Sequence, residues 1–207
     1  DDARDRLADE QIQTQPRFLL WGFSASGTFS DRFSLLHPER LAAVAAGGCT
    51  HSLPLATYAG ENLPYPVGTY DYTTLTGAHF EAEAFAALPR FLYKGGEDTG
   101  GTITTDEGIY PADEYFEQFM RPKLKAESAS SPKPLITSAD LSHTEEALLK
   151  YRIYEGASFV NEFIAVREIY AEAGIDASTF TLYPDAGHEI TDAMEEDIRA
   201  FFLATIQ

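Results

Sequence analysis

The chain has 207 residues, of which 44% are hydrophobic, and this length and composition suit one globular domain. Its 33 acidic and 15 basic residues give a formal net charge of −18, which argues against nucleic acid as a partner because phosphates would be repelled. No apolar run approaches the roughly 18 residues that a membrane-spanning helix needs, so no membrane partner is expected. Cys49 is the only cysteine, which excludes a disulfide within the chain.

The first part of the chain alternates helical and strand-like patterns. In chain order, the pattern predicts a polar helix over 2–12, a buried strand over 17–21, a helix over 26–36 and a strand of small residues over 41–48. Residues 50–80 are rich in Pro, Gly and Tyr, and we expect an irregular loop with short helical pieces there.

The second part of the chain continues the alternation around one long excursion. The pattern predicts a strand over 90–96, an amphipathic helix over 155–174, a strand over 179–184 and a helix over 191–206. Strands that alternate with helices indicate an α/β fold with a parallel sheet and flanking helices.

The excursion covers residues 99–150 and is expected to be an insertion that borders a cleft like a lid. Within it we expect a helix over 110–120 and a loop over 125–134. The whole chain, 1–207, is interpreted as one domain.

Ser24 lies where a strand breaks directly into a helix, in Gly22-Phe23-Ser24-Ala25-Ser26. Parallel sheets gather their reactive loops at the carboxyl ends of their strands, and small flanking residues suit a nucleophile elbow that lifts the serine Oγ above the sheet. The helix N-terminus offers free N–H groups, and that of Ala25 is the candidate oxyanion donor. Ser26 stands where the usual G-x-S-x-G pattern has glycine and is the rival nucleophile. A tight turn whose serine has no chemical role is the alternative.

A nucleophilic serine needs a base, and His188 is the candidate because it lies in the loop after the strand over 179–184. His51 follows the strand over 41–48, so it could line the cleft as a supporting residue behind the catalytic groups. The remaining histidines are expected to cap a helix or to face solvent: His37, His79 and His143.

The base in turn needs a carboxylate that holds its tautomer, and two aspartates follow strand-like runs. We favour Asp98, which ends the better strand on a glycine-flanked bend, and keep Asp140 as the alternative. With Asp98, the three residues follow one another in the order Ser, Asp, His, which α/β-hydrolases share.

Several stretches carry a resemblance to a known family: "LLWGFSASGTFSDRFSLLHPERLAAVAAG", "LPYPVGTYDYTTLTG", "PRFLYKGGEDT" and "FVNEFIAVREIYAEAGIDASTFTLYPDAGHEIT". In these the chain resembles the α/β-hydrolase superfamily, and most of all its esterase-type branch related to polyhydroxybutyrate depolymerases and feruloyl esterases. The resemblance implies Ser24 as nucleophile, His188 as general base and Asp98 as orienting acid. It implies hydrolysis of carboxylic esters through an acyl-enzyme with no cofactor or metal, and it leaves aryl and polymeric esters open as substrates.

The sequence also departs from this family, whose fold places several strands and a helix before the elbow strand. Here only a helix is expected before it, and the loop that gives the second oxyanion donor is absent. The chain therefore resembles the C-terminal part of the fold. We expect an upstream half of the fold, or a second copy of the chain, to cover the strand at 17–22. A non-catalytic binding or interaction protein on a truncated hydrolase fold is the alternative function.

Overall fold

The computed structural model describes residues 2–100, 102–105, 108–130, 143–154 and 159–206. Its main feature is a four-stranded sheet in the order β1-β2-β5-β8, in which every neighbouring pair is parallel. The strands are β1 (Phe18–Phe23), β2 (Leu41–Gly47), β5 (Arg90–Gly95) and β8 (Ser178–Tyr183). The predicted α/β fold with a parallel sheet is thereby confirmed.

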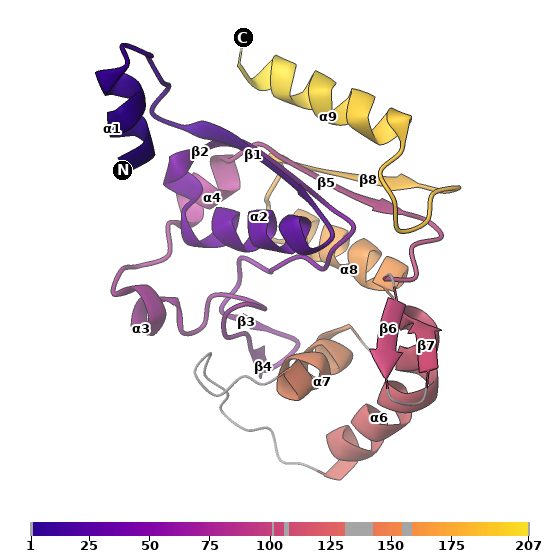
Figure 1. The fold of residues 1–207 in the computed structure, drawn as a ribbon. Helices are drawn as coiled ribbons and strands as arrows, with labels where there is room; N and C mark the ends of the chain where they lie inside the picture. The colour runs from indigo at the N-terminus through magenta and orange to yellow at the C-terminus, as the bar shows by residue number, and fades with distance from the viewer. Residues whose placement is uncertain (1, 101, 106–107, 131–142, 155–158, 207) are drawn as a thin grey trace.

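Helices cover both faces of this sheet. In Figure 1, α9 (Asp192–Thr205) lies over one face, and α2 (Ala25–Leu36) and α8 (Phe159–Glu172) lie over the other. Side chains alternate along β5, so Phe91 and Tyr93 pack toward α9 while Leu92 joins the core beneath α8. None of the described helices is both long and apolar enough to cross a membrane.

The remaining elements are short. Helix α1 (Asp2–Asp9) precedes β1, and the 3-10 turn Pro38–Arg40 joins α2 to β2. The segment between β2 and β5 contains the small hairpin of β3 (Thr57–Tyr58) and β4 (Glu61–Asn62), α3 (Tyr72–Thr76) and α4 (Ala82–Ala87). After β5 come the hairpin of β6 (Thr102–Thr105) and β7 (Gly108–Pro111), α5 (Ala112–Tyr115), the π-helical turn Phe116–Met120, α6 (Arg121–Ser130) and α7 (His143–Ile153). In Figure 1, β6, β7, α6 and α7 lie on the α2 and α8 side of the sheet.

Two expectations for the long excursion are wrong. Residues 125–130, predicted as part of a loop, belong to helix α6. The sequence pattern also predicts a loop around His143, but this residue begins helix α7. The serines near the end of α6 are weak helix formers, but Leu124 in the same helix is fully buried. Packing of such an anchor outweighs the local preference. The interpretation of 99–150 as a lid stays a prediction, and residues 131–142 lie outside the described part.

Strand β1 forms an edge of the sheet. It pairs with β2 on one side, and no described strand pairs with its other side. Phe18, Leu19 and Trp21 are 39%, 38% and 47% exposed, although strands of parallel sheets are usually buried. The structure therefore leaves an apolar strand edge open among the residues that it describes.

Candidate active site

The turn that carries Ser24 is tightly built. Ser24 has a φ of 56° and a ψ of −122°, a backbone conformation that residues other than glycine rarely adopt. Its N–H donates to the Gly47 carbonyl at 2.9 Å. A Cβ on Gly22 would lie 2.0 Å from the Ser26 carbonyl oxygen, and one on Gly27 would lie 2.4 Å from the Gly47 carbonyl oxygen. Strand and helix thus cross so closely that only glycine fits at both positions.

The structure brings Ser24, His188 and Asp98 together. The Nε2 atom of His188 lies 2.9 Å from the Ser24 Oγ, and its Nδ1 atom lies 3.0 Å from the Asp98 Oδ1. Each residue follows the carboxyl end of a different strand, namely β1, β8 and β5. The predicted contact between the three side chains is therefore present. The alternative acid, Asp140, lies outside the described residues.

The three side chains differ in exposure. The Asp98 side chain is 0% exposed, whereas the His188 side chain is 22% exposed and Ser24 is partly buried. The Phe23 ring lies 5.1 Å from the imidazole and shields one side of it. This arrangement keeps water from the Asp98 carboxylate, while the Ser24 hydroxyl remains accessible to a reactant.

Close contacts between two backbone segments hold His188 beside Asp98. A Cβ on Gly95 would lie 2.3 Å from the carbonyl oxygens of both Ala186 and Gly187. The Glu97 N–H also donates to the Ala186 carbonyl at 2.9 Å. The loop after β8 therefore rests directly on the end of β5, and the absence of a side chain at Gly95 permits this.

The start of α2 bears on the candidate oxyanion donor. The first hydrogen bond along the helix runs from the Thr28 N–H to the Ser24 carbonyl at 2.9 Å, so the helix itself does not use the Ala25 N–H. The rival Ser26 is engaged locally, since its hydroxyl donates to the Phe23 carbonyl at 2.8 Å and accepts from the Phe23 N–H at 3.0 Å. Ser26 therefore supports the turn instead of facing His188.

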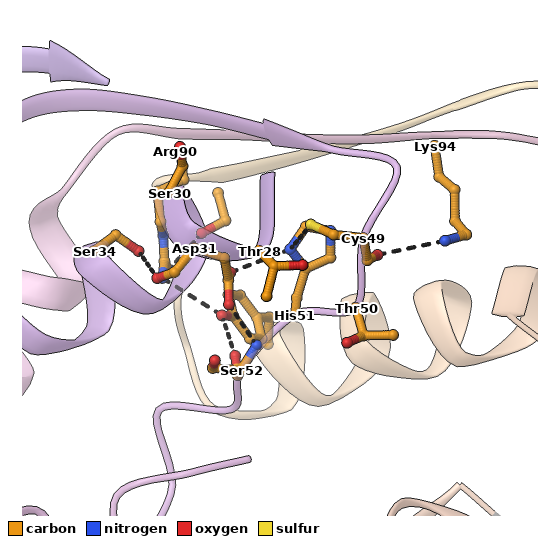
Figure 2. A network of polar contacts seen from close by, with 12 residues as sticks. Thr28, Ser30, Asp31, Ser34, Cys49, Thr50, His51, Ser52, Arg90 and Lys94 are labelled. Carbon is orange, nitrogen blue, oxygen red and sulfur yellow. Dashed lines mark hydrogen bonds and ion pairs between the residues drawn. The ribbon is translucent and has the colours of Figure 1, made fainter. Parts of the chain in front are cut away.

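His51 belongs to a second aspartate–histidine pair, shown in Figure 2. Its Nδ1 lies 3.1 Å from the Asp31 Oδ1, and the Ser52 N–H donates to the Asp31 Oδ2 at 2.8 Å. The His51 and Asp31 side chains are 1% and 3% exposed. The expectation that His51 could line the cleft is thus wrong, because helix α2 supplies a buried carboxylate that holds it inside the core.

Burial and charge act in opposite directions on this pair. Burial alone would lower the pKa of His51, but the adjacent Cys49 sulfur and the Asp31 carboxylate raise it to about 10. Burial alone would raise the pKa of Asp31, but the hydrogen bond and charge of His51, with the Ser52 N–H, lower it. Both shifts favour the ionised pair at neutral pH.

The sequence reasoning missed Asp31 and Lys94. Asp31 lies in a helical pattern among other polar residues, and nothing in the sequence singles it out. Lys94 is 1% exposed within β5, where its Nζ lies 3.5 Å from the Asp98 Oδ2. A lysine inside the otherwise apolar run "FLYKGG" was the available signal.

Comparison with protein-family models, with curated proteins and with solved structures finds no match for this chain. In the described residues, no group of three His, Cys, Asp or Glu side chains could hold a metal ion. The described residues do contain a hydroxyl, an imidazole and a carboxylate joined by hydrogen bonds, those of Ser24, His188 and Asp98, and such a group can carry out nucleophilic catalysis.

Proposed function

We propose that this chain carries the catalytic residues of a serine hydrolase that cleaves carboxylic esters on a fold of the α/β-hydrolase type. The observation that carries the proposal is the Ser24–His188–Asp98 chain of hydrogen bonds, with the serine on a strained turn. A residue keeps such a backbone conformation only where its surroundings enforce it, and such residues cluster at functional sites.

The geometry suits nucleophilic attack by Ser24. With Nδ1–H donating to Asp98, the Nε2 of His188 is free to accept the Ser24 proton as Oγ attacks an ester carbonyl. His188 then returns the proton to the departing alcohol, which leaves an acyl group on Ser24. Water, deprotonated by the same imidazole, hydrolyses the acyl-enzyme. Throughout, Asp98 orients the ring and stabilises its positive charge.

The tetrahedral intermediate of this reaction carries a negative oxygen that needs hydrogen-bond donors. The Ala25 N–H at the start of α2 is the proposed first donor, and the helix dipole favours a negative charge at this end. A second donor is expected from a polypeptide outside the described structure. Loss of one donor typically costs about 10²-fold or more in rate.

The open edge of β1 suggests where that polypeptide binds. Trp21 and Leu19 are exposed toward the face that α9 covers, while Phe18 packs against Phe33 of α2 on the opposite face, with the two rings tilted and their centroids 5.8 Å apart. A covering unit must therefore pair with β1 and bury apolar side chains on both faces of the sheet. A polypeptide that adds further parallel strands with their helices meets both needs, and we propose it as the occupant of this edge.

Hydrolysis of a chromogenic short-chain ester tests the proposed function. Wild type should release the chromophore, and Ser24→Ala should lose about 10⁴-fold or more of kcat. Ser26→Ala is the comparison variant and should lose far less, because its hydroxyl supports the turn through Phe23 but does not contact His188 in the structure. Equal activity of wild type and Ser24→Ala would contradict the proposal.

A binding or interaction role without catalysis is the second candidate, and the open apolar edge of β1 is the observation that favours it. The two roles differ in what a partner does. If the proposed polypeptide binds along β1 and ester hydrolysis stays absent from the complex, the binding role is the better account.

A further inference from the structure

Lys94 is a buried cation next to the proposed active site. The residue is 1% exposed and lies on β5, all of whose residues are buried. Removing an ammonium group from water costs free energy unless charged or polar groups compensate for it. Figure 2 shows the side chain directed toward the segment that follows β2, where its Nζ donates to the Cys49 carbonyl at 3.4 Å.

The charge of Lys94 is compensated by Asp98. The Nζ atom lies 3.5 Å from the Asp98 Oδ2, and both side chains are almost completely buried. The ring of Phe159 also lies near this ammonium group, with its centroid 5.9 Å from Nζ. The Asp98 carboxylate is therefore shared between the imidazole of His188 and the buried ammonium group of Lys94.

The two oxygens of Asp98 have different partners. Oδ1 accepts from the Gly100 N–H at 2.7 Å and lies 3.0 Å from the His188 Nδ1. Oδ2 has no hydrogen-bond donor among the described residues, and Lys94 is its ion-pair partner there. Without Lys94, a buried oxygen would lack any compensation, and rotation of the carboxylate would be one way to regain it.

The ion pair also spans a turn. β5 ends at Gly95, and the chain bends back so that the Asp98 N–H donates to the Gly95 carbonyl at 3.3 Å. Lys94 thus links the acid to the strand before it, and through Cys49 to the segment after β2. Two residues before Cys49, at the end of β2, the Gly47 carbonyl accepts the Ser24 N–H. The backbone segment that Lys94 contacts is therefore also hydrogen-bonded to the turn that carries Ser24.

We propose that Lys94 is a positioning residue of this site, which holds the Asp98 Oδ2 so that Oδ1 stays directed at the His188 Nδ1. Its effect on turnover rests on the proposed function, whereas its effect on the imidazole does not. Lys94 acts through Asp98 and touches neither the substrate nor the reacting hydroxyl.

The test compares Lys94→Met, which keeps most of the length of the side chain without its charge, with Lys94→Arg, which keeps the charge. We expect Lys94→Met to lower kcat by about tenfold or more with little change in KM, because a misdirected catalytic group slows chemistry without weakening binding. Lys94→Arg should recover most of kcat. In an Asp98→Asn background, Lys94→Met should add little further loss, since the group that it acts through is gone.

A second readout is independent of ester hydrolysis. The His188 Nδ1 proton, identified by its absence from His188→Gln, should resonate far downfield in the proton NMR spectrum of wild type. Lys94→Met should shift or broaden it, and Lys94→Arg should preserve it. If wild type and Ser24→Ala show equal hydrolysis, the proposed function fails, and this spectrum still decides the role of Lys94.

An unchanged resonance in folded Lys94→Met would overturn the proposal, as would equal fractional losses of kcat from Lys94→Met with and without Asp98→Asn. Circular dichroism establishes that each variant is folded. If Lys94→Met does not fold, Lys94→Arg still decides, because loss of the resonance in a folded, charge-retaining variant would contradict a role in holding Oδ2.

Discussion

The molecule contains two aspartate–histidine pairs with nearly equal geometry and opposite surroundings. His188 lies 3.0 Å from Asp98 and its side chain is 22% exposed, whereas His51 lies 3.1 Å from Asp31 and its side chain is 1% exposed. The outer nitrogen of His188 meets the Ser24 hydroxyl, while that of His51 has no hydrogen-bond partner among the described residues. An aspartate–histidine pair can thus suit a catalytic or a structural role. The difference lies in whether solvent reaches the imidazole and whether a hydroxyl contacts its outer nitrogen.

The largest expected effect separates the pairs by activity. His188→Gln should lower kcat for ester hydrolysis by about 10⁴-fold, because the proposed base is removed, with little change in thermal stability. His51→Gln should keep kcat within about tenfold of wild type, because it lies outside the chain of hydrogen bonds to Ser24. Steady-state kinetics of both variants at one pH, with thermal unfolding of the same samples, make the comparison.

The next effect separates the pairs by stability. Asp31→Asn leaves a buried imidazolium without its counter-charge and should cost about 3–5 kcal/mol of the free energy of unfolding. At the other pair, Asp98→Asn alone would also leave the buried Lys94 without its counter-charge, so the matched variant is Asp98→Asn combined with Lys94→Met. A smaller loss is expected there, because His188 reaches solvent. Urea unfolding measures both. A larger loss in the double variant would contradict the assignment of the buried, stabilising role to the Asp31–His51 pair.

The pH dependence of stability sharpens the account of the buried pair. Because the folded pKa of His51 is raised from 6.5 to about 10, its stabilisation is complete below about pH 6.5 and is lost as the pH rises through 10. The stability difference between wild type and His51→Gln should therefore shrink between pH 6.5 and 10. Asp31, whose pKa is lowered, stays ionised across this window. A constant difference would show that His51 is buried in its neutral form.

A smaller effect probes how the backbone sets the exposed pair. Gly95→Ala places a Cβ 2.3 Å from two carbonyl oxygens, so we expect a loss of about 1–3 kcal/mol and a lower kcat as the His188 loop is displaced. Gly187→Ala is the control, because the nearest atom to its added Cβ is the Glu97 carbonyl oxygen at 4.0 Å. If Gly187→Ala is as harmful as Gly95→Ala, the loop is not held by the contact at Gly95.

The residues of the proposed site could be predicted because each follows a strand. Ser24, Asp98 and His188 come after β1, β5 and β8, and the carboxyl ends of parallel strands meet at one edge. His51 obeys the same rule after β2, yet it is buried, because nothing in the sequence shows that Asp31 of α2 reaches it. A position after a strand therefore predicts at which edge of the sheet a residue lies. Whether its side chain is buried or exposed depends on its contacts with other elements, which the sequence does not show.

The long excursion was harder to predict because local propensity and packing disagree there. The hairpin of β6 and β7 is short, and the sequence carries few alternating apolar positions to mark it. Helix α6 depends on the burial of Leu124, which no local pattern shows. Lys94 carried a visible signal, a charge within an apolar strand, but its partner four residues later became clear only from the turn that joins them.

The central claim is that Ser24 is an activated nucleophile, and covalent labelling tests it most directly. The full chain is incubated with a fluorophosphonate, which reacts with activated serines, and the intact mass and peptide masses are then measured. The account predicts one adduct on the peptide that contains Ser24, none in Ser24→Ala, and far slower labelling in His188→Gln than in His51→Gln. Absence of an adduct in wild type, or an adduct that persists in Ser24→Ala, would contradict it.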